Sequence, residues 1–464
     1  MMLQRFRHLL QRKFVQDTLV LQASRIGITL LGMITWVIVP VVMGSEHYGA
    51  WGLVQSFLAT WQALDLTGLS TSTSVLLATA VGAKDTGEIQ TLMAVFVKVS
   101  LAWAVLSISV LGLAGPLLAG RLYAHPTYLI MTNPLAYRMG DTSGGEIGVL
   151  AALLALSLLF DPFYNLVLML FRSRRAMRTV AIIQNVNQGV LSACLVTAAL
   201  INPTPAALVI ARLVYSAVTM VLALAVYTRL RLQGDVPFPP IQAVLAQVWN
   251  APYRRYWRFG TANAIDKNLA DLYIQIPIQM TGILAGNAAV GYVQLALRGI
   301  QQTGLFTSAI FENMQAVVPQ AVGRGDYARL WRNFSRVLLV LLVGGAAFYL
   351  GVALFAPLIV VPLFGDEWQP TIPLIGALAV YGSMTMVGGI FGPLYRAFHI
   401  MQRMIVVKVV SLALLLPVGL LLITVLGALG GVWMINGLFT LSVILTAATT
   451  LPELRRRARE QVAG

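Results

Sequence analysis

Two short patterns each occur twice in this 464-residue chain, at nearly the same spacing. Residues 80–85 read AVGAKD, and residues 321–326 read AVGRGD, 241 positions later. Two glycines five residues apart recur 242 positions later: Gly44 and Gly49, then Gly286 and Gly291. The stretches between these anchors differ in length by one residue. Repeats within an apolar chain are typical of secondary transporters, whose substrate site lies between the halves, so the repeat predicts a carrier.

The chain is too apolar for a soluble domain. Hydrophobic residues make up 58% of it and charged residues 11%, against roughly a quarter charged in soluble proteins. Twelve apolar blocks are long enough to cross a bilayer as helices: 17–43, 48–80, 90–116, 148–171, 179–201, 205–228, 258–283, 288–322, 333–362, 369–395, 404–425 and 428–450. The predicted fold is an all-α integral membrane protein. Blocks two, eight, nine and ten exceed one crossing, so we expect them to tilt or to extend beyond the lipid.

The blocks divide the chain into two six-helix halves. The predicted parts are an N-terminal half with an amphipathic surface helix, a cytosolic linker with a second surface helix, a C-terminal half and a basic cytosolic tail: 1–232, 233–257, 258–452 and 453–464. Because each half has an even number of spans, the halves must be parallel. A pseudo-twofold axis along the membrane normal should relate them.

A third correspondence links residues 171–178 with 395–402, only 224 positions apart. The first half has a longer outer loop, 117–147, which accounts for the shorter offset.

The net charge of +15 follows from topology. With the N-terminus inside, the predicted cytosolic stretches hold 25 of the 32 Lys and Arg residues, and the outer loops hold only Arg121 and Arg138. This distribution predicts cytosolic termini, and nucleic-acid binding is unnecessary to explain the charge. The single cysteine, Cys194, excludes a disulfide within the chain and makes a cysteine metal site untenable. No histidine has a partner at metal-ligand spacing, so we expect no metal.

The segment order resembles that of the multidrug/oligosaccharidyl-lipid/polysaccharide (MOP) exporter superfamily. Three features are similar to those of bacterial polysaccharide flippases of the O-antigen transporter type: Tyr48-Gly49 after the first span, the 80–85 motif after the second, and the basic 172–178 loop after the fourth. Relatives that move the peptidoglycan lipid precursor carry two further spans, which are not evident here.

This resemblance implies a flippase in the bacterial cytoplasmic (inner) membrane. It would move an undecaprenyl-pyrophosphate oligosaccharide from the cytosolic to the outer leaflet for polysaccharide synthesis, such as that of lipopolysaccharide. The implied partners are the lipid-linked oligosaccharide, membrane lipid and the polysaccharide polymerase machinery. We expect no cofactor, and we expect a monomer.

The repeated motif is interpreted as mechanical. Gly82 and Gly323 are expected to form tight turns. Asp85 and Asp326 are expected to cap the next helix or to pair with an arginine.

Cations inside the spans are the candidate substrate-binding groups, because an ionisable side chain facing lipid is costly. The 242-residue offset aligns Arg25 with Lys267, which predicts a twofold-related pair facing one cavity. Asp271 lies one helical turn from Lys267 and could neutralise it, whereas Arg25 has no acid within four residues in its own span. Arg298 could grip a phosphate, and the resemblance supports arginines in spans one and eight.

The acids of the spans could pair with these cations or carry a coupling proton: Asp65, Asp266, Asp271 and Glu312. Asp161 precedes Pro162 and could accept from backbone groups near a kink. Arg212 and Lys98 are interpreted as cations that snorkel toward the outer and cytosolic surfaces.

Two other functions stay open on the sequence. A multidrug or cation antiporter of the same superfamily would use acidic cavity residues, but the aligned positions in spans one and seven are basic. A membrane glycosyltransferase or polymerase would need a substantial loop and would leave the repeat unexplained. There is no Walker loop and no Ser/His/acid grouping, so we predict no enzyme and no catalytic residues.

Overall fold

A computed structural model describes the chain except for residues 1–12, 124–143, 234–235, 254–255, 399 and 464. The described residues are almost entirely helical, with no strand among them. In the first half of the chain the helices are α2 (Lys13–Gln62), α3 (Leu69–Ala83), α4 (Thr86–Tyr123), α6 (Gly144–Ala155), η2 (Leu156–Leu159), α7 (Asp161–Ser173), α8 (Met177–Ile201), α9 (Pro205–Leu230) and α10 (Ile241–Gln247). The N-terminal surface helix and most of the 117–147 loop lie outside the described residues.

The second half continues the same pattern. Its helices are α11 (Trp257–Ala285), α12 (Asn287–Gln302), α13 (Leu305–Gly323), α14 (Tyr327–Phe364), η4 (Asp366–Trp368), α15 (Thr371–Gly389), α16 (Phe391–Ala397), α17 (Met401–Leu426) and α18 (Ala428–Ala463). The predicted spans all lie on described helices, and spans one and two share α2, which is kinked at Gly44. Nine helices of the described part are long and apolar enough to cross a membrane, so the all-α membrane fold is confirmed.

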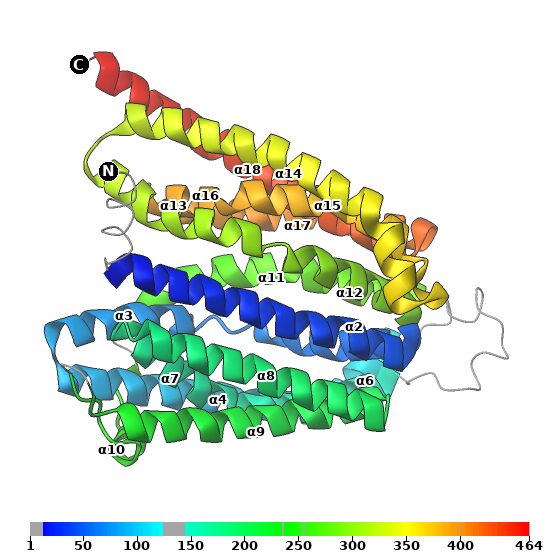
Figure 1. Ribbon diagram of the computed structural model, residues 1–464, viewed down its shortest axis with the longest axis horizontal. Helices are drawn as coiled ribbons and strands as arrows, with labels where there is room; N and C mark the ends of the chain where they lie inside the picture. Colours follow the sequence, from blue (N-terminus) through cyan, green and yellow to red (C-terminus); the bar gives the residue numbers. More distant parts are fainter. Residues whose placement is uncertain (1–12, 124–143, 234–235, 254–255, 399, 464) are drawn as a thin grey trace, which may run out of the picture. The chain divides into compact units, whose positions relative to one another are not determined.

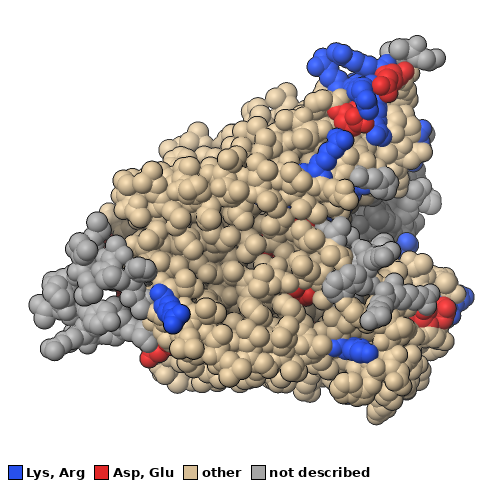
Figure 2. Space-filling model, turned by 180° about the vertical axis from the view of Figure 1, so that it is seen from behind, with Lys and Arg blue, Asp and Glu red and all other residues tan. Residues whose placement is uncertain are grey.

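The chain forms two compact units. Unit 1 holds the described residues up to Val42 together with Asp65–Gly120 and Gly145–Ala264. Unit 2 holds Met43–Leu64, the described residues of Arg121–Gly144 and the chain from Ile265 onward. Within unit 1, α8 packs along α9, and within unit 2, α14 packs along α15 and α17 along α18 (Figure 1). The face drawn in Figure 2 is largely uncharged, as lipid contact requires, and a large group of charged atoms marks the end of α18.

The long second and eighth spans do not simply tilt. The second is broken between Gln62 and Leu69, and the eighth is broken between Gln302 and Leu305. The tenth span is interrupted at Ile390, whereas the ninth is the single 38-residue helix α14. Three of the four blocks that are longer than one crossing therefore contain a helix break. Backbone breaks of this kind are tolerated at membrane depth only where protein or water can satisfy the freed groups.

Backbone geometry agrees with the 242-residue register at Gly44 and Gly286. Gly44 interrupts α2 with φ 73° and ψ 169°, and its repeat mate Gly286 has φ 90° and ψ 174°. Only glycine adopts this conformation readily. The kink at Gly44 leaves the N–H of Ser45 without its helical partner, and the side chain of Glu367 accepts from it at 2.6 Å.

The turns that follow the repeated AVG motif use a different residue from the predicted glycine. Gly82 and Gly323 lie inside α3 and α13, and the left-handed residues are Lys84 (φ 57°) and Gly325 (φ 72°). In both turns the N–H of the following aspartate donates at 3.0 Å to the carbonyl five residues back, which is a Schellman closure.

The two aspartates of the motif differ in their side-chain bonding. Asp85 accepts from the N–H of Glu88 at 2.9 Å and so caps α4 as predicted. Asp326 stands at the N-cap position of α14 without a side-chain capping bond.

The weaker 224-residue correspondence also holds in the backbone. The N–H of Ala176 donates to the carbonyl of Phe171, and the N–H of Ile400 donates to that of Tyr395, both at 3.0 Å. The fourth spans of both halves therefore end in the same turn.

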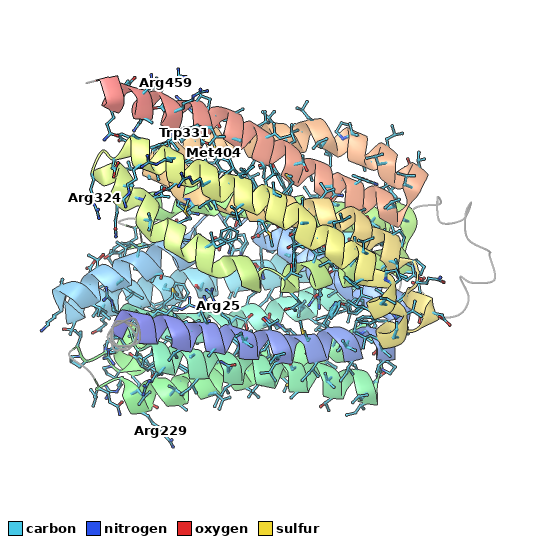
Figure 3. The ribbon with its side chains drawn as sticks, turned by 45° about the horizontal axis from the view of Figure 1, so that its top comes forward. Arg25, Arg229, Arg324, Trp331, Met404 and Arg459 are labelled. Carbon is cyan, nitrogen blue, oxygen red and sulfur yellow. The ribbon has the colours of Figure 1, made fainter. Side chains whose placement is uncertain are left out.

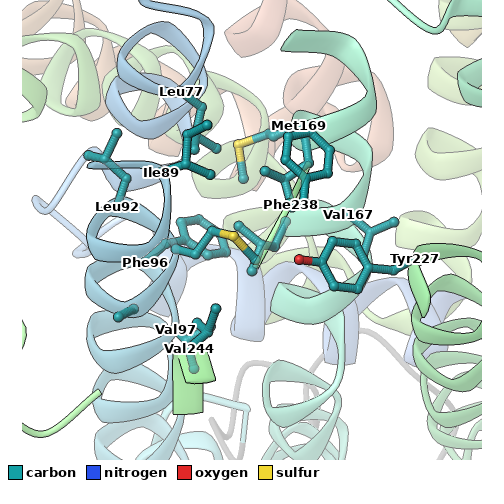
Figure 4. Close-up of a cluster of buried hydrophobic side chains, with 14 of the residues drawn as sticks. Leu77, Ile89, Leu92, Phe96, Val97, Val167, Met169, Tyr227, Phe238 and Val244 are labelled. Atoms are coloured by element: carbon teal, nitrogen blue, oxygen red, sulfur yellow. The ribbon is translucent and has the colours of Figure 1, made fainter. Parts of the chain in front are cut away.

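The predicted linker is folded onto unit 1 and is not simply solvated. Val236, Phe238 and Val244 are almost fully buried in one hydrophobic cluster with side chains of α3, α4, α7 and α9 (Figure 4). The predicted surface helix over 241–256 is only the short α10, followed by turns. The linker packs on unit 1 because burial of its apolar side chains is favourable, although the prolines around them prevent a long helix.

Arg174 holds the linker in place. Its guanidinium donates to the carbonyls of Leu230 (3.2 Å), Arg231 (2.6 Å), Gln233 (2.6 Å) and Val236. Its Cζ lies 3.4 Å from the centroid of the Phe238 ring. Burial lowers the pKa of the Arg174 guanidinium, although an arginine keeps its charge at physiological pH.

We expect Arg174→Gln to release the linker. The substitution removes several charge-assisted hydrogen bonds, each of which contributes about 1.5–3 kcal/mol. Limited proteolysis should then cut residues 231–241 at least tenfold faster than in the unaltered protein. Arg175→Gln is the matched control, because Arg175 is an exposed neighbour in the same turn. Equal cleavage rates for the two variants would show that Arg174 does not hold the linker.

Candidate substrate-binding site

The site in unit 2 is built where the last part of α2 crosses α12. A Cβ on Gly49 would lie 1.8 Å from the carbonyl oxygen of Asn287, and one on Gly291 would lie 2.3 Å from that of Ser45. Asn287 and Ser45 are themselves repeat mates at the 242-residue offset. The two helices therefore cross reciprocally, with backbone against backbone, as small residues allow in membrane proteins.

Arg298 of α12 lies beyond this crossing and is half-buried. Its Nη2 donates to Oε1 of Gln55 at 2.5 Å, and its Cζ lies 5.7 Å from the ring centroid of the buried Tyr48. Among the described residues, no carboxylate lies within ion-pair distance of Arg298. An amide orients the guanidinium without neutralising it, so the positive charge remains available to an anion.

Uncharged polar groups join the same part of α2 to α11. The side-chain amide of Gln279 on α11 donates to the carbonyl of Ser56 at 3.1 Å and to the hydroxyl of Thr60. The hydroxyl of Ser56 donates to the carbonyl of Gln275 at 3.2 Å. Sequence reasoning concentrated on charges and missed Gln55 and Gln279. Their signal was an amide side chain inside an otherwise apolar span.

Asp266 is buried and forms an ion pair. It is 5% exposed, and Nζ of Lys408 lies 2.6 Å from its Oδ1. The hydroxyl of Tyr395 donates to Oδ2 at 2.9 Å. Lys408, which topology alone would assign to the cytosolic surface, also donates to the carbonyl of Asp266 at 2.7 Å. The pair satisfies both charges inside unit 2.

Lys267, the next residue, points elsewhere. Its side chain and that of Asp271 are both exposed, and no ion pair joins these two described residues. The neutralisation of Lys267 by Asp271 through a direct ion pair therefore stays a prediction. Both groups remain available to a ligand or to water.

Arg25 lies in unit 1, half-buried on α2 (Figure 3). The preceding Ser24 donates to the carbonyl of Ala181 at 3.3 Å and accepts from the side-chain amide of Asn185 at 2.6 Å. These contacts fix this turn of α2 against α8. Arg25 and Lys267 belong to different compact units, so the predicted pairing of the two across one cavity stays a prediction.

Two candidate acids remain, Asp65 and Glu312. Asp65 accepts from the N–H of Thr67 at 2.9 Å in the break between α2 and α3, which is an Asx-turn arrangement. The side chain of Glu312 lies outside the described part of the chain.

Two cations that seemed peripheral in the sequence are engaged in unit 1. Arg212 does not simply snorkel. Its Nη2 lies 3.3 Å from Oδ2 of Asp161, and its Cζ lies 4.4 Å from the ring centroid of Tyr215. Lys98 donates to the carbonyls of Trp249 (2.8 Å) and Ala251 (3.3 Å), and so holds the turn after α10. Within the described residues, no group of three or more His, Cys, Asp or Glu side chains could hold a metal.

Comparison with known proteins agrees with this architecture. The family model of polysaccharide biosynthesis proteins matches residues 144–373. No curated protein gives a significant match. An inward-facing multidrug resistance MATE family transporter of the MOP superfamily superposes with a TM-score of 0.67 at 17% identity, covering 95% of this chain and 98% of that one.

Two further solved structures are similar. A eukaryotic MATE transporter has a TM-score of 0.61 at 13% identity, covering 97% of this chain and 99% of its own. A MOP superfamily transporter from Pyrococcus furiosus has a TM-score of 0.60 at 14% identity, covering 96% of each chain. That protein is described as having a binding pocket of reverse polarity, which suggests a different function.

These observations define a multi-pass membrane protein with a transporter fold. Residues 144–373 are similar to polysaccharide biosynthesis proteins, and the fold is similar to that of solved transporters of the MOP superfamily.

Proposed function

We propose that the protein is a flippase that carries a lipid-linked oligosaccharide, of the undecaprenyl-pyrophosphate class, from the cytosolic to the outer leaflet by alternating access. The observation that carries the proposal is Arg298: a half-buried arginine oriented by Gln55 and Tyr48, with no carboxylate beside it in the described chain. A pyrophosphate supplies the anion that such a guanidinium lacks.

The uncharged surroundings suit the rest of such a substrate. Gln55 and Thr60 are half-buried polar residues on the same part of α2, and Gln279 of α11 donates to Thr60. Sugar hydroxyls bind to groups of this kind, while the isoprenoid tail can stay in lipid. The match to polysaccharide biosynthesis proteins over 144–373 supports this substrate class over a drug. We propose the inner membrane of a bacterium, with cytosolic termini, as its location, because of the charge distribution between loops.

The second candidate is a multidrug or cation antiporter, as in the MATE structures that share the fold. The exposed carboxylate of Asp271 favours it, because a cation or a coupling proton needs an acid that is not already bound. The described reverse polarity of the Pyrococcus furiosus pocket is a precedent within this fold for a change of charge. Here Arg25, Lys267 and Arg298 make the candidate set basic.

The test is complementation of a strain that lacks its own flippase. We expect Arg298→Ala and Arg25→Ala each to lower glycan export about tenfold to a hundredfold, which corresponds to a lost charge-assisted hydrogen bond of about 1.5–3 kcal/mol. Lysine at either position should restore part of the export, because it returns the charge without the planar fork. Arg229→Ala is the matched control, since Arg229 is exposed at the end of α9 (Figure 3).

Protein level and thermal stability are measured alongside export. Normal export by an Arg25→Ala, Arg298→Ala double variant would refute the anion site. Failure of the unaltered protein to restore glycan export, together with cation or drug efflux that Asp271→Asn abolishes, would instead favour the antiporter.

A further inference from the structure

A groove opens between α13 and α14 in unit 2, with a volume of about 240 Å³. One end is polar and is lined by Gln320, Arg324, Arg329 and Asn333. The other end is apolar and is lined by Met314, Val317 and Val337. A cavity with a cationic end and an apolar end matches an amphiphile with an anionic head and a hydrocarbon tail.

The groove is positively charged. Arg324 and Arg329 are both exposed, and Asp326 contributes one negative charge, which leaves a net charge of +1. Arg324 extends from the end of α13 (Figure 3), where its Nη2 donates to Oε1 of Gln320 at 3.4 Å. The charge distribution between loops predicts that this end of the helices faces the cytosol, where the leaflet is rich in anionic lipid.

The repeat shows why the groove exists only in the second copy. At the 241-residue offset, Asn333 corresponds to Leu92 and Val337 corresponds to Phe96. In unit 1 these two larger side chains are 2% and 3% exposed and belong to the buried cluster that includes Leu77 of α3 (Figure 4). Replacing a phenylalanine by valine opens volume, and replacing a leucine by asparagine makes its wall polar.

The first copy also covers this surface with its own chain. Arg329 corresponds to Glu88, whose carboxylate accepts from the hydroxyl of Tyr256 at 2.8 Å, in the segment that follows α10. Val244 of α10 packs in the same cluster as Leu92 and Phe96. In unit 2 the segment after the last span is a straight continuation of α18, and among its described residues none lines the groove. The chain's own N-terminal segment is basic and would be repelled by this groove.

We propose that the groove between α13 and α14 binds an anionic phospholipid from the surrounding membrane, with its phosphate between Arg324 and Arg329 and one acyl chain along Val317 and Val337. This lipid is a resident ligand of the fold. Its site is separate from Arg298 and does not depend on what the protein transports. Arginine suits the phosphate because its fork donates two parallel hydrogen bonds.

Native mass spectrometry of the full chain in detergent tests the proposal, with added phosphatidylglycerol and phosphatidylcholine as the probes. We expect phosphatidylglycerol to bind at least tenfold more tightly than phosphatidylcholine. An Arg324→Gln, Arg329→Gln variant should lose this preference. An Arg332→Gln, Arg336→Gln variant, which loses the same charge from exposed positions of α14 outside the groove, should keep it.

A variant that fills the groove distinguishes binding inside the groove from attraction by surface charge alone. Asn333→Leu with Val337→Phe gives unit 2 the residues of unit 1 and removes no charge, so it should abolish lipid retention as fully as the arginine variant. Its thermal stability in detergent without added lipid reports that it folds. The proposal fails if both arginine pairs lower binding equally, if the filled variant folds and retains the lipid, or if inorganic phosphate alone stabilises the protein as phosphatidylglycerol does.

Discussion

Gly49→Ala will prevent the protein from reaching its folded state in useful yield. The added Cβ would lie 1.8 Å from the backbone oxygen of Asn287 and 2.9 Å from the backbone nitrogen of Gly291. Backbone atoms cannot rotate away as a side chain can, so α2 and α12 must separate. Overpacking of a core costs about 1–3 kcal/mol where side chains can adjust, and we expect more than about 3 kcal/mol here.

The measurements are the yield of monodisperse protein in detergent and its thermal midpoint. Gly344→Ala is the control, because Gly344 is a helical glycine in α14 with no neighbouring atom within 4 Å of its added Cβ. Alanine at such a position should be neutral or slightly stabilising, since it favours the helix. Gly291→Ala should behave like Gly49→Ala, because the crossing is reciprocal. If Gly49→Ala melts at the same temperature as Gly344→Ala, the close approach of the two helices is wrong.

The repeat could be predicted from the sequence because it rests on glycines, which are favoured where the backbone has a positive φ angle. Gly44 and Gly286 are such residues, and their φ and ψ angles agree closely. The precise turn residue of the AVG motif was not readable. Lys84 takes the left-handed position where its repeat mate is Gly325, and a lysine carries no signal for that conformation. The nearby glycine at 82 was the more obvious and wrong choice.

Which charged side chains pair with one another could be determined only from the fold. Lys408 and Asp266 are 142 positions apart, and Arg212 and Asp161 are 51 apart. No local spacing rule links such pairs, because helical neighbours are three or four residues apart. Helix breaks were missed for a related reason. Apolar composition predicts where a span lies. It does not predict where the helix breaks and a backbone N–H bonds to a side chain instead, as the N–H of Thr67 does to Asp65.

The contact between the first and the fifth span of each half is made by different groups in the two units. The 242-residue offset aligns Ser24 with Asp266. In unit 1, Ser24 bonds to Ala181 and Asn185 of α8 through uncharged groups. In unit 2, Asp266 of α11 bonds to Lys408 of α17 through an ion pair. A neutral hydrogen bond is therefore sufficient to join a first and a fifth span in this architecture, which sets the expectation for the next experiment.

Lys408→Met will destabilise unit 2 by about 3–5 kcal/mol, the usual cost of removing one partner from a buried ion pair. The carboxylate of Asp266 is 5% exposed and would keep only the hydroxyl of Tyr395 as a side-chain donor. Asp266→Asn should cost a similar amount, because it leaves the ammonium group of Lys408 without its counter-charge. The double variant Asp266→Asn, Lys408→Met should recover much of the loss, since no buried charge then remains.

A double-mutant cycle of unfolding free energy in one detergent isolates this coupling. Arg456→Met is the control, because Arg456 forms an exposed ion pair with Glu453 on α18, and such pairs contribute about 0–1 kcal/mol. A coupling energy near zero, with the two single losses simply adding in the double variant, would mean that Asp266 and Lys408 do not depend on each other. Recovery in the double variant, together with unchanged glycan export, would place Asp266 among the residues that hold the fold and exclude it from proton coupling.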